Sequence, residues 1–469
     1  MIQSGFMRLI FLWLLIIISQ ETFSQDTLLK HQTGLTTSTE TLGGYETKIA
    51  ATAKSGKLVV VISDREKLEC AVYNKDFSLV AASKQALNKR NIELYKDYSI
   101  KWTGAIMNDK RACFFYGANP KFNRNKYLVW SEMVSYDGSL EHKLSIEIPA
   151  EVEILNWIFE DEKAYLICTD NKKQELVFYV FDVNGMAQEK RIQIKLKEYF
   201  KSKYSLSEYF YEATAIYPSQ EQSLQSAVNL TKFFLQSNKI FAVVVNPGEP
   251  PHIWEFDLDR YIPKFKKLDM TGFSGFTGST RFFNNATIFD GKIFVFNVTR
   301  KGSEIGIFDS TGSQLLKKFE IKKDSKFFFS ELPRKTYRSS AKPQIDVIGD
   351  NARLFVLLTE GRVGIAVSKI HDTAYLVTSG TFDDNSTLVT YGSGPVSRVV
   401  QFKIIIQSST LNQIEEPYTS PNDITEVTQR QELVVPYTQF RPFRWNGVDY
   451  LSYFTPGDGL FRIQTAVKE

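Results

Sequence analysis

Short apolar runs recur along most of the chain, and a polar turn precedes each of them. The turns are three residues long and most end in lysine, as in Ser55-Gly56-Lys57 and Asp290-Gly291-Lys292. Each run that follows is apolar over four to six consecutive residues, which is typical of a strand covered on both faces. Turns rich in Gly, Asn and Asp favour tight hairpins because these residues tolerate positive φ angles. The pattern therefore predicts a β-hairpin at each turn.

The turns are regularly spaced. They lie at residues 55–57, 108–110, 161–163, 237–239 and 290–292, with weaker copies at 351–353 and 446–448. Three of the six intervals between their last residues are 53 residues long, which indicates an internal repeat. We interpret the longer intervals as insertions. The apolar runs at 354–358 and 450–454, which follow the weaker copies, are expected to be strands like the others.

A second marker occurs in three of the repeats. It is an aromatic residue and an Asp before a Gly turn, at residues 136–138, 181–185 and 308–312. Asp-Gly and Asn-Gly pairs are also hairpin signals, so this marker predicts the turn between the third and fourth strands. The repeating unit is therefore a four-stranded antiparallel meander of 53 residues.

Seven such units resemble the blades of a seven-bladed β-propeller, an all-β fold. The last unit ends one strand short, and residues 26–37 are expected to supply its outer strand, so that both termini share one blade. The expected blade units lie near residues 46–96, 97–150, 151–196, 230–270, 282–323, 344–382, and 440–469 together with 26–37.

The resemblance is to the propeller architecture and to no specific family, because the turns differ from the WD, kelch and Asp-box signatures. The composition and the end of the leader also resemble those of exported Bacteroidetes proteins. Two other architectures stay open. One is a pair of β-sandwiches, which a constant period does not favour; the other is an eighth blade, if residues 388–391 and 399–406 form a hairpin of their own.

Three insertions separate the units, at residues 197–219, 324–343 and 383–439. In a propeller, such insertions gather on one face together with the loops that join second to third strands. Tyr and Arg side chains are frequent anchors of binding interfaces. The candidate ligand-binding residues are Tyr199, Tyr204, Tyr209 and Tyr211 in the first insertion, Arg334, Tyr337 and Arg338 in the second, and Lys121 and Arg124 in the loop 119–126.

The same aromatic residues have a structural interpretation. A large insertion needs an apolar anchor of its own, so these side chains equally serve to hold the insertions against the sheets. In the first insertion they also fit the buried faces of short helices.

Composition and charge restrict the function further. Apolar residues make up 43% of the chain and charged residues 23%, which excludes a disordered chain and a multi-span membrane protein. The 57 Lys and Arg residues barely exceed the 53 Asp and Glu residues, so no nucleic-acid partner is expected.

The N-terminus predicts export. Arg8 precedes an apolar run at residues 9–18 that is too short to span a bilayer, and small residues follow before Gln25. We expect a signal peptide over residues 1–24, a single propeller domain over residues 25–469, and a secreted or periplasmic protein without a membrane span. No Cys follows the cleavage site, so a lipid anchor is not expected. The three cysteines, Cys70, Cys113 and Cys168, lie in apolar runs and are expected to be buried thiols.

The sequence carries no catalytic signature. The four histidines are scattered without metal-ligand spacing, and residues 272–276 depart from a nucleophile elbow at Phe276. Since phosphate-loop and dinucleotide fingerprints are also missing, neither a metal nor a cofactor is expected. The sequence favours a non-catalytic protein that binds a protein or a glycan. A polysaccharide lyase or hydrolase on the same scaffold, and a structural component of a cell-envelope assembly, are the alternatives.

Overall fold

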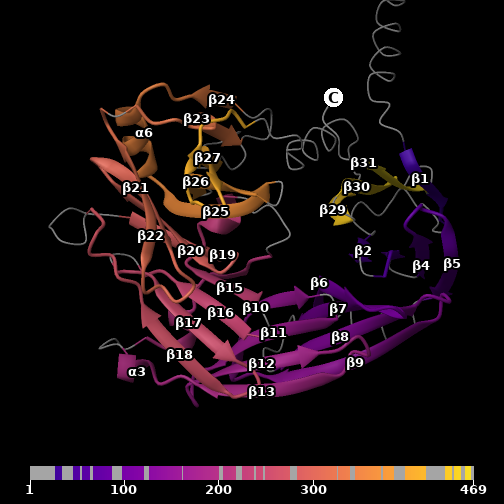
Figure 1. Cartoon of the computed structure of the whole chain (residues 1–469). Coiled ribbons are helices and arrows are strands. Elements are labelled where there is room, and N and C mark those ends of the chain that lie inside the picture. Colours follow the sequence, from indigo (N-terminus) through magenta and orange to yellow (C-terminus); the bar gives the residue numbers. More distant parts are fainter. Residues whose placement is uncertain are drawn as a thin grey trace, which may run out of the picture. The chain divides into compact units, whose positions relative to one another are not determined.

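The computed structural model describes most of the chain after the expected leader (Figure 1). The described residues are 27–33, 46–52, 55–63, 67–86, 98–120, 126–160, 162–199, 204–217, 224–236, 239–246, 249–274, 283–324, 326–338, 344–370, 373–384, 397–418, 439–445, 448–455 and 460–465. The predicted signal peptide lies outside them. Within these ranges, no helix has the length and apolar character that crossing a membrane requires.

The chain divides into two compact units. The first, Met1–Ile148 with Asp182–Met186 and Ser420–Glu469, contains three four-stranded sheets in its described part. In sheet order these are β2 (Glu46–Thr52), β3 (Lys57–Ser63), β4 (Lys67–Asn74) and β5 (Leu79–Ala86); β6 (Tyr98–Met107), β7 (Arg111–Pro120), β8 (Lys126–Ser135) and β9 (Leu140–Pro149); and β1 (Thr27–Gln32), β31 (Leu460–Thr465), β30 (Val448–Thr455) and β29 (Gln439–Trp445).

The second unit, Pro149–Phe181 with Ala187–Thr419, contains four sheets in its described part. In sheet order the first two are β10 (Val152–Glu160), β11 (Lys163–Asp170), β12 (Glu175–Phe181) and β13 (Ala187–Gln193); and β14 (Ala213–Ala215), β15 (Thr231–Gln236), β16 (Lys239–Val244), β17 (His252–Asp257) and β18 (Ile262–Lys267). The other two are β19 (Phe283–Phe289), β20 (Lys292–Thr299), β21 (Gly302–Phe308) and β22 (Leu315–Lys322); and β24 (Gln344–Val347), β23 (Glu331–Arg338), β27 (Ser397–Gln407), β26 (Ala374–Asp384) and β25 (Arg362–Ile370), with β28 (Gln413–Ile414) paired to β27. The helices are α3 (Leu196–Tyr199), α4 (Leu206–Tyr209), α5 (Leu224–Ala227) and α6 (Asn351–Leu358).

The predicted meander is confirmed by the turns that join the strands. Six of the seven polar turns of the repeat, all except 351–353, connect the first and second antiparallel strands of a sheet. One example is the β19–β20 turn, across which Phe289 pairs with Lys292. Asp290 and Gly291 in that turn have φ angles of 49° and 67°, which explains the Asp-Gly pair. The three aromatic-Asp turns connect β8 to β9, β12 to β13 and β21 to β22, as predicted.

The sharing of one sheet by both chain ends is also confirmed. β1 pairs with β31 as the outermost strand of the sheet β1–β31–β30–β29, and Leu29 lies opposite Ile463. Leu29 and Ile463 are both buried, in one apolar cluster with Trp445. The N-terminal strand therefore covers an edge that the C-terminal strands would otherwise leave unpaired.

The expected strand at residues 354–358 is wrong, because these residues lie in helix α6. The Asp350 side chain accepts a hydrogen bond from the Ala352 amide at 2.9 Å and caps the helix. Leu354, Phe355, Leu357 and Leu358 are buried, whereas Val356 is exposed, as one face of a helix requires. A short apolar run does not distinguish a buried strand from a buried helix by periodicity.

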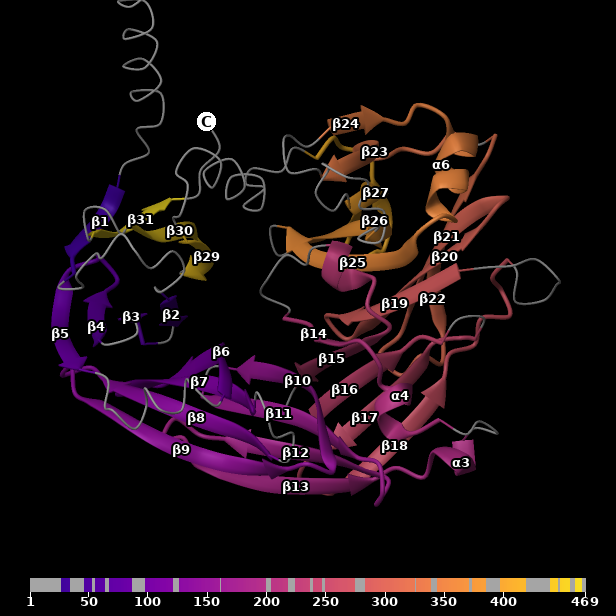
Figure 2. The same ribbon diagram turned by 180° about the vertical axis from the view of Figure 1, so that it is seen from behind.

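The sheet that contains β25 also differs from the expected boundaries (Figures 1 and 2). Its fourth strand is β23, which precedes β25 in the chain and pairs with β27, and β24 extends the sheet by a fifth strand. The segments 324–343 and 383–439, expected to be insertions, thus each contribute a full strand. Residues 399–406 belong to β27 in this same sheet, so they do not start a blade of their own; residues 388–391 lie outside the described residues.

Burial explains why the second strands carry continuous apolar runs. Every residue of β11 after Lys163 is buried, whereas β13, the outermost strand of the same sheet, is largely accessible. The cores lie between neighbouring sheets: the ring centroids of Phe178 and Phe256 are 5.8 Å apart, and those of Phe296 and Phe402 are 5.7 Å apart. The three cysteines are buried free thiols, as predicted.

Candidate functional site

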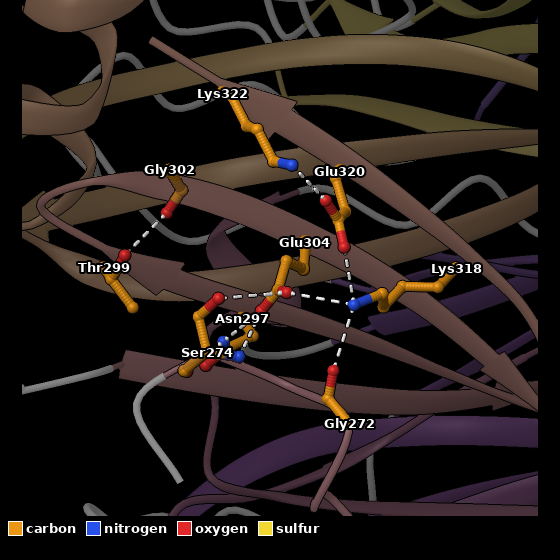
Figure 3. A network of polar contacts seen from close by, with 9 residues as sticks. All are labelled: Gly272, Ser274, Asn297, Thr299, Gly302, Glu304, Lys318, Glu320 and Lys322. Carbon is orange, nitrogen blue, oxygen red and sulfur yellow. Dashed lines mark hydrogen bonds and ion pairs between the residues drawn. The ribbon is translucent and has the colours of Figure 1, made fainter. Parts of the chain in front are cut away.

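A polar hollow of about 450 Å³ lies at one end of the sheet β19–β22. Its wall combines the turn between β20 and β21, the end of β22, and Ser274 from the connection that precedes β19 (Figure 3). A turn between second and third strands and two connections between sheets thus meet here. The lining residues are Ser274, Thr299, Lys301, Gly302, Ser303, Glu304, Glu320, Lys322, Lys323 and Asp324.

The β20–β21 turn is held by its own hydrogen bonds. The Thr299 hydroxyl donates to the Gly302 carbonyl at 3.1 Å and accepts from the Lys301 amide at 3.2 Å. At Gly302 the strands β21 and β22 approach so closely that a Cβ would lie 2.7 Å from the Ile321 carbonyl oxygen. This explains the glycine and fixes the position from which Lys301 extends.

Glu304 forms the base of the hollow and is 5% exposed. Its carboxylate accepts hydrogen bonds from the Ser274 amide at 2.8 Å, the Ser274 hydroxyl at 3.2 Å, the Asn297 side-chain amide at 2.9 Å and the Lys318 ammonium at 3.4 Å. These donors occupy the acceptor sites of an ionised carboxylate. Glu304 is therefore held in place by four hydrogen bonds and anchors the segments that surround it.

The connection that carries Ser274 is anchored by Phe273. This side chain is 2% exposed, its ring centroid is 5.9 Å from that of Phe308, and the Lys318 ammonium lies 5.8 Å from the ring centre. The ring occupies the space above Gly306, where a Cβ would come within 2.2 Å of it. The Ser274 hydrogen bonds to Glu304 therefore depend on this packing.

Lysine and glutamate alternate along β22 and compensate one another. The strand register places Glu304 opposite Glu320, and such a like-charge pair is unfavourable by itself. The Lys318 ammonium contacts both carboxylates, at 3.4 and 2.7 Å, and Lys322 contacts Glu320 at 2.8 Å. Hydrogen bonds from Lys318 and Lys322 lower the pKa of Glu320 to about 2. Burial opposes the protonation of Lys318, but its contacts with Glu320 and Glu304 outweigh burial and raise its pKa.

Two other lysines at the hollow are exposed. In the part of the chain that the structure describes, neither Lys301 nor Lys323 has a carboxylate partner for its ammonium group. The lining contains no histidine, cysteine or aromatic side chain. Among the described residues, no group of three or more His, Cys, Asp or Glu side chains is placed to hold a metal ion. The arrangement is suited to holding a polar ligand.

Tyr209, a predicted ligand-binding residue, instead anchors the first insertion. It is 3% exposed; its hydroxyl lies 2.9 Å from Nδ1 of His252 and accepts from the Trp254 indole at 3.0 Å. Burial raises the pKa of Tyr209, and burial followed by the charge of Lys267 lowers the pKa of His252 to about 4. The structural interpretation of the aromatic residues therefore holds for Tyr209.

The other predicted tyrosines are more accessible. Tyr199 is 39% exposed and packs against Trp254 and Phe265, with ring centroids 5.2 and 4.8 Å apart. Tyr204 and Tyr211 are exposed on either side of the short helix α4. Their role in ligand binding stays a prediction.

The remaining candidates lie in other segments. Arg334, Tyr337 and Arg338 belong to strand β23, and Arg334 makes an ion pair with Glu331 at 2.8 Å. The side chains of Tyr337 and Arg338, and the whole of Lys121 and Arg124, lie outside the described residues. The role of these residues in ligand binding stays a prediction.

The sequence did contain a signal for Glu304. In four of the sheets, the hairpin after the third strand begins with an Asn or Asp residue. The residue five positions before it is ionisable and buried in each case; these residues are Glu69, Glu132, His252 and Glu304. Each binds a polar side chain of another segment, such as His31 to Glu69 at 2.9 Å. A single ionisable residue inside an apolar run, at the same position in several repeats, indicates a buried polar contact.

One of these residues belongs to a second polar cluster, in the first unit. Lys48 donates to the Tyr116 hydroxyl at 2.9 Å, Tyr116 donates to Glu132, and Nδ1 of His142 is 3.5 Å from Glu132. These groups are capable of proton transfer, but Lys48 and Tyr116 are 1% and 3% exposed. This burial favours a structural role for Lys48 and Tyr116.

These elements define the class of the protein: it is all-β and built mostly from four-stranded antiparallel meanders of the kind that form the blades of a β-propeller, as predicted. The number of blades in a closed ring stays a prediction. No protein-family model matches the chain, and no curated protein does.

Solved structures do match the chain. One is the β-propeller domain of the trilobed protease from Pyrococcus furiosus, at 9% identity and a TM-score of 0.35, over 90% of this chain and 96% of the other. Another is prolyl oligopeptidase B from Galerina marginata, at 7% identity and a TM-score of 0.36, over 88% of this chain and 47% of the other. A third is an ACO/RPE65 chimera, at 10% identity and a TM-score of 0.30, over 60% and 64%. The chain thus spans about half the length of the oligopeptidase. Likenesses this distant carry no functional argument.

Proposed function

We propose that the protein is an exported, non-catalytic binding protein that holds a glycan or a protein partner on the face where the second-to-third-strand turns and the inter-sheet connections meet. The observation that carries this proposal is the polar hollow at the end of β19–β22. Its buried anion, Glu304, is saturated by hydrogen bonds, whereas Lys301 and Lys323 extend from its rim. Rigid walls with exposed polar groups favour binding, because little ordering remains to be done when a ligand arrives.

The chemistry of the hollow supports binding over turnover. A general acid or base needs a pKa near the working pH, but hydrogen bonds from Lys318 and Lys322 lower the pKa of Glu320 to about 2. The Ser274 hydroxyl donates to the Glu304 carboxylate, and the lining contains no histidine, the usual base beside a nucleophilic serine.

Export belongs to the same proposal. The expected cleavage before Gln25 leaves β1 intact, since that strand begins at Thr27 and completes the terminal sheet. N-terminal sequencing of protein recovered from outside the cytoplasm is expected to begin at Gln25. Recovery of the full-length chain from the cytoplasm would contradict export.

The binding proposal is tested with the mature protein, residues 25–469. The protein is screened against a polysaccharide array and in a pull-down from an extracellular or periplasmic extract, and each bound polysaccharide is then assayed for cleavage. We expect binding without turnover. Cleavage of a bound polysaccharide would contradict the non-catalytic role and support a lyase or hydrolase.

One further observation favours a protein partner within an envelope assembly. Leu332, Ile345 and Val347 on the edge hairpin β23–β24 are 60%, 50% and 63% exposed. Exposed apolar side chains in such a group are frequent at protein interfaces. If this surface binds the partner, Val347→Glu is expected to abolish its capture, while Lys163→Glu, at an exposed residue of another sheet, is expected to leave capture unchanged.

A further inference from the structure

We infer that the hollow at the end of β19–β22 binds an acidic saccharide, one that carries a carboxylate or sulfate group. This inference rests on the proposed binding function and names the ligand class for that site. Two features of the hollow support it: the lysines that have no carboxylate partner, and the chemistry of its lining.

Among the described residues, two lysines at the hollow have no carboxylate partner, and one exposed carboxylate, that of Asp324, has no cationic partner. Lys301 extends from the β20–β21 turn and Lys323 from the end of β22, and both are exposed. Lys318 and Lys322 are already engaged by Glu304 and Glu320. An anionic group placed between Lys301 and Lys323 would gain charge-assisted hydrogen bonds that no described carboxylate now supplies.

The lining favours a saccharide over a peptide. All ten lining residues are polar, charged or glycine. Peptides and proteins bind tightly through apolar and aromatic anchors in desolvated pockets, and this hollow offers none. The carboxylates of Glu320 and Asp324 accept hydrogen bonds from hydroxyl groups, and a hydroxyl such as that of Thr299 both donates and accepts. A densely hydroxylated ligand matches such a surface.

The test measures binding of three oligosaccharides of equal length by calorimetry: a galacturonate oligomer for the carboxylate, a sulfated oligomer for the sulfate, and a neutral glucan. We expect at least one acidic oligomer to bind more tightly than the neutral glucan, with affinity that falls as salt rises. Lys301→Ala and Lys323→Ala are each expected to weaken that binding about threefold to fivefold, the range for partly exposed ion pairs.

The matched controls are Lys75→Ala and Lys163→Ala, which remove the same charge at exposed turn residues outside the hollow. They are expected to leave affinity unchanged. Equal binding of neutral and acidic oligomers, no binding of any of the three, or equal losses in all four variants would overturn the inference. Capture of a protein or a neutral glycan by the same preparation would at the same time leave the proposed binding function in place.

Discussion

At the scale of single residues, some ionisable side chains are buried in an apolar environment. Lys232 is the extreme case. It is fully buried, and its ammonium group donates to the Asn285 side-chain oxygen and, at 2.8 Å, to the Ala286 carbonyl. Asn285 in turn donates to the Val363 carbonyl at 2.7 Å. These contacts join β15, β19 and β25, which belong to three successive sheets, so the lysine connects the sheets although its charge is costly to bury.

Lys232 predicts a distinctive pH dependence. Burial, with a smaller effect of the Arg362 charge, lowers its pKa to about 7, below the ordinary value of 10.5. Between these values the unfolded chain binds the proton and the folded chain does not, so the free energy of unfolding rises with pH from 7 to 10.5. Lys232→Met is expected to flatten this rise and to raise the free energy of unfolding at pH 7 by about 1–3 kcal/mol. Urea unfolding at pH 7.5 and 9.5 measures this change in the free energy of unfolding, and Lys163→Met is the control at an exposed lysine. If the free energy of unfolding of Lys232→Met rises with pH as steeply as that of the parent, the result argues against the buried cation.

A second residue-scale prediction concerns Asp309 in the β21–β22 turn. Its side chain accepts from the amides of Ser313 at 2.6 Å and Gln314 at 2.9 Å. Burial alone would raise the pKa of Asp309, but hydrogen bonds from Thr311, Gln314 and Ser313 lower it. Its stabilising contribution is therefore present at neutral pH and lost as the pH falls through the acid range. Asp309→Ala is expected to cost about 1–2 kcal/mol in thermal or urea unfolding. The neighbouring Ser310→Ala is the control, and equal losses in both would refute the role of the carboxylate.

At the scale of elements, the hollow exists because one connection is fastened to one sheet. Phe273 packs over Gly306, and the hydrogen bonds of Ser274 then reach Glu304. The first insertion is held in a similar way, because its buried residue Tyr209 contacts His252. In both cases a buried aromatic residue fixes the segment, and a buried ionisable residue of the third strand fixes its polar end.

Removing this anchor tests the element. Phe273→Ala is expected to cost about 3–5 kcal/mol in unfolding free energy, as for other buried Phe side chains. It is also expected to weaken ligand binding at the hollow in conditions where the variant stays folded, because Ser274 loses its fixed position. Phe273→Leu keeps most of the apolar volume and serves as the milder comparison. If Phe273→Ala binds ligand as the parent does, Ser274 does not form the wall of the site.

At the scale of the whole molecule, the two chain ends depend on each other through one sheet. β1 pairs with β31 over five register positions, from Thr27 opposite Gln464 to Gln32 opposite Leu460. His31 also lies 2.9 Å from Glu69 of β4 in the next sheet. The N-terminal strand therefore contributes to two sheets of the first unit.

Deleting this strand is expected to expose the edge of β31. A variant that begins at residue 34 is expected to lower the melting temperature and to promote self-association, since an unpaired edge accepts strands from other molecules. A variant that begins at Gln25 retains β1 and is the control. Differential scanning calorimetry and size-exclusion chromatography report the two effects, and a variant lacking β1 that matches the control in both would show that the strand is dispensable.

The features that could be predicted from the sequence differ among these three scales. The hairpin turns, the third-to-fourth-strand turns and the terminal sheet were predictable, because their signals are local: Gly and Asp at turns, and apolar runs of strand length. The strand expected at 354–358 failed since Asp350 caps a helix whose apolar side is as continuous as that of a buried strand. Tyr209 was predicted to bind ligand, yet it is buried against His252. The presence of an aromatic residue in an insertion does not by itself show whether its side chain anchors the insertion or is exposed to a ligand.

The sequence by itself determined the repeat, the class of fold and the position of most strands, because turn chemistry and apolar periodicity act between residues close together in the chain. Only the tertiary structure decided that β23 joins β27, that Glu304 meets Ser274 thirty residues away, and that Lys301 and Lys323 have no carboxylate partner among the described residues at one hollow. Those facts depend on how distant segments pack. The repeated ionisable position marks Glu304 as a polar contact, but it does not identify the segment that Glu304 contacts.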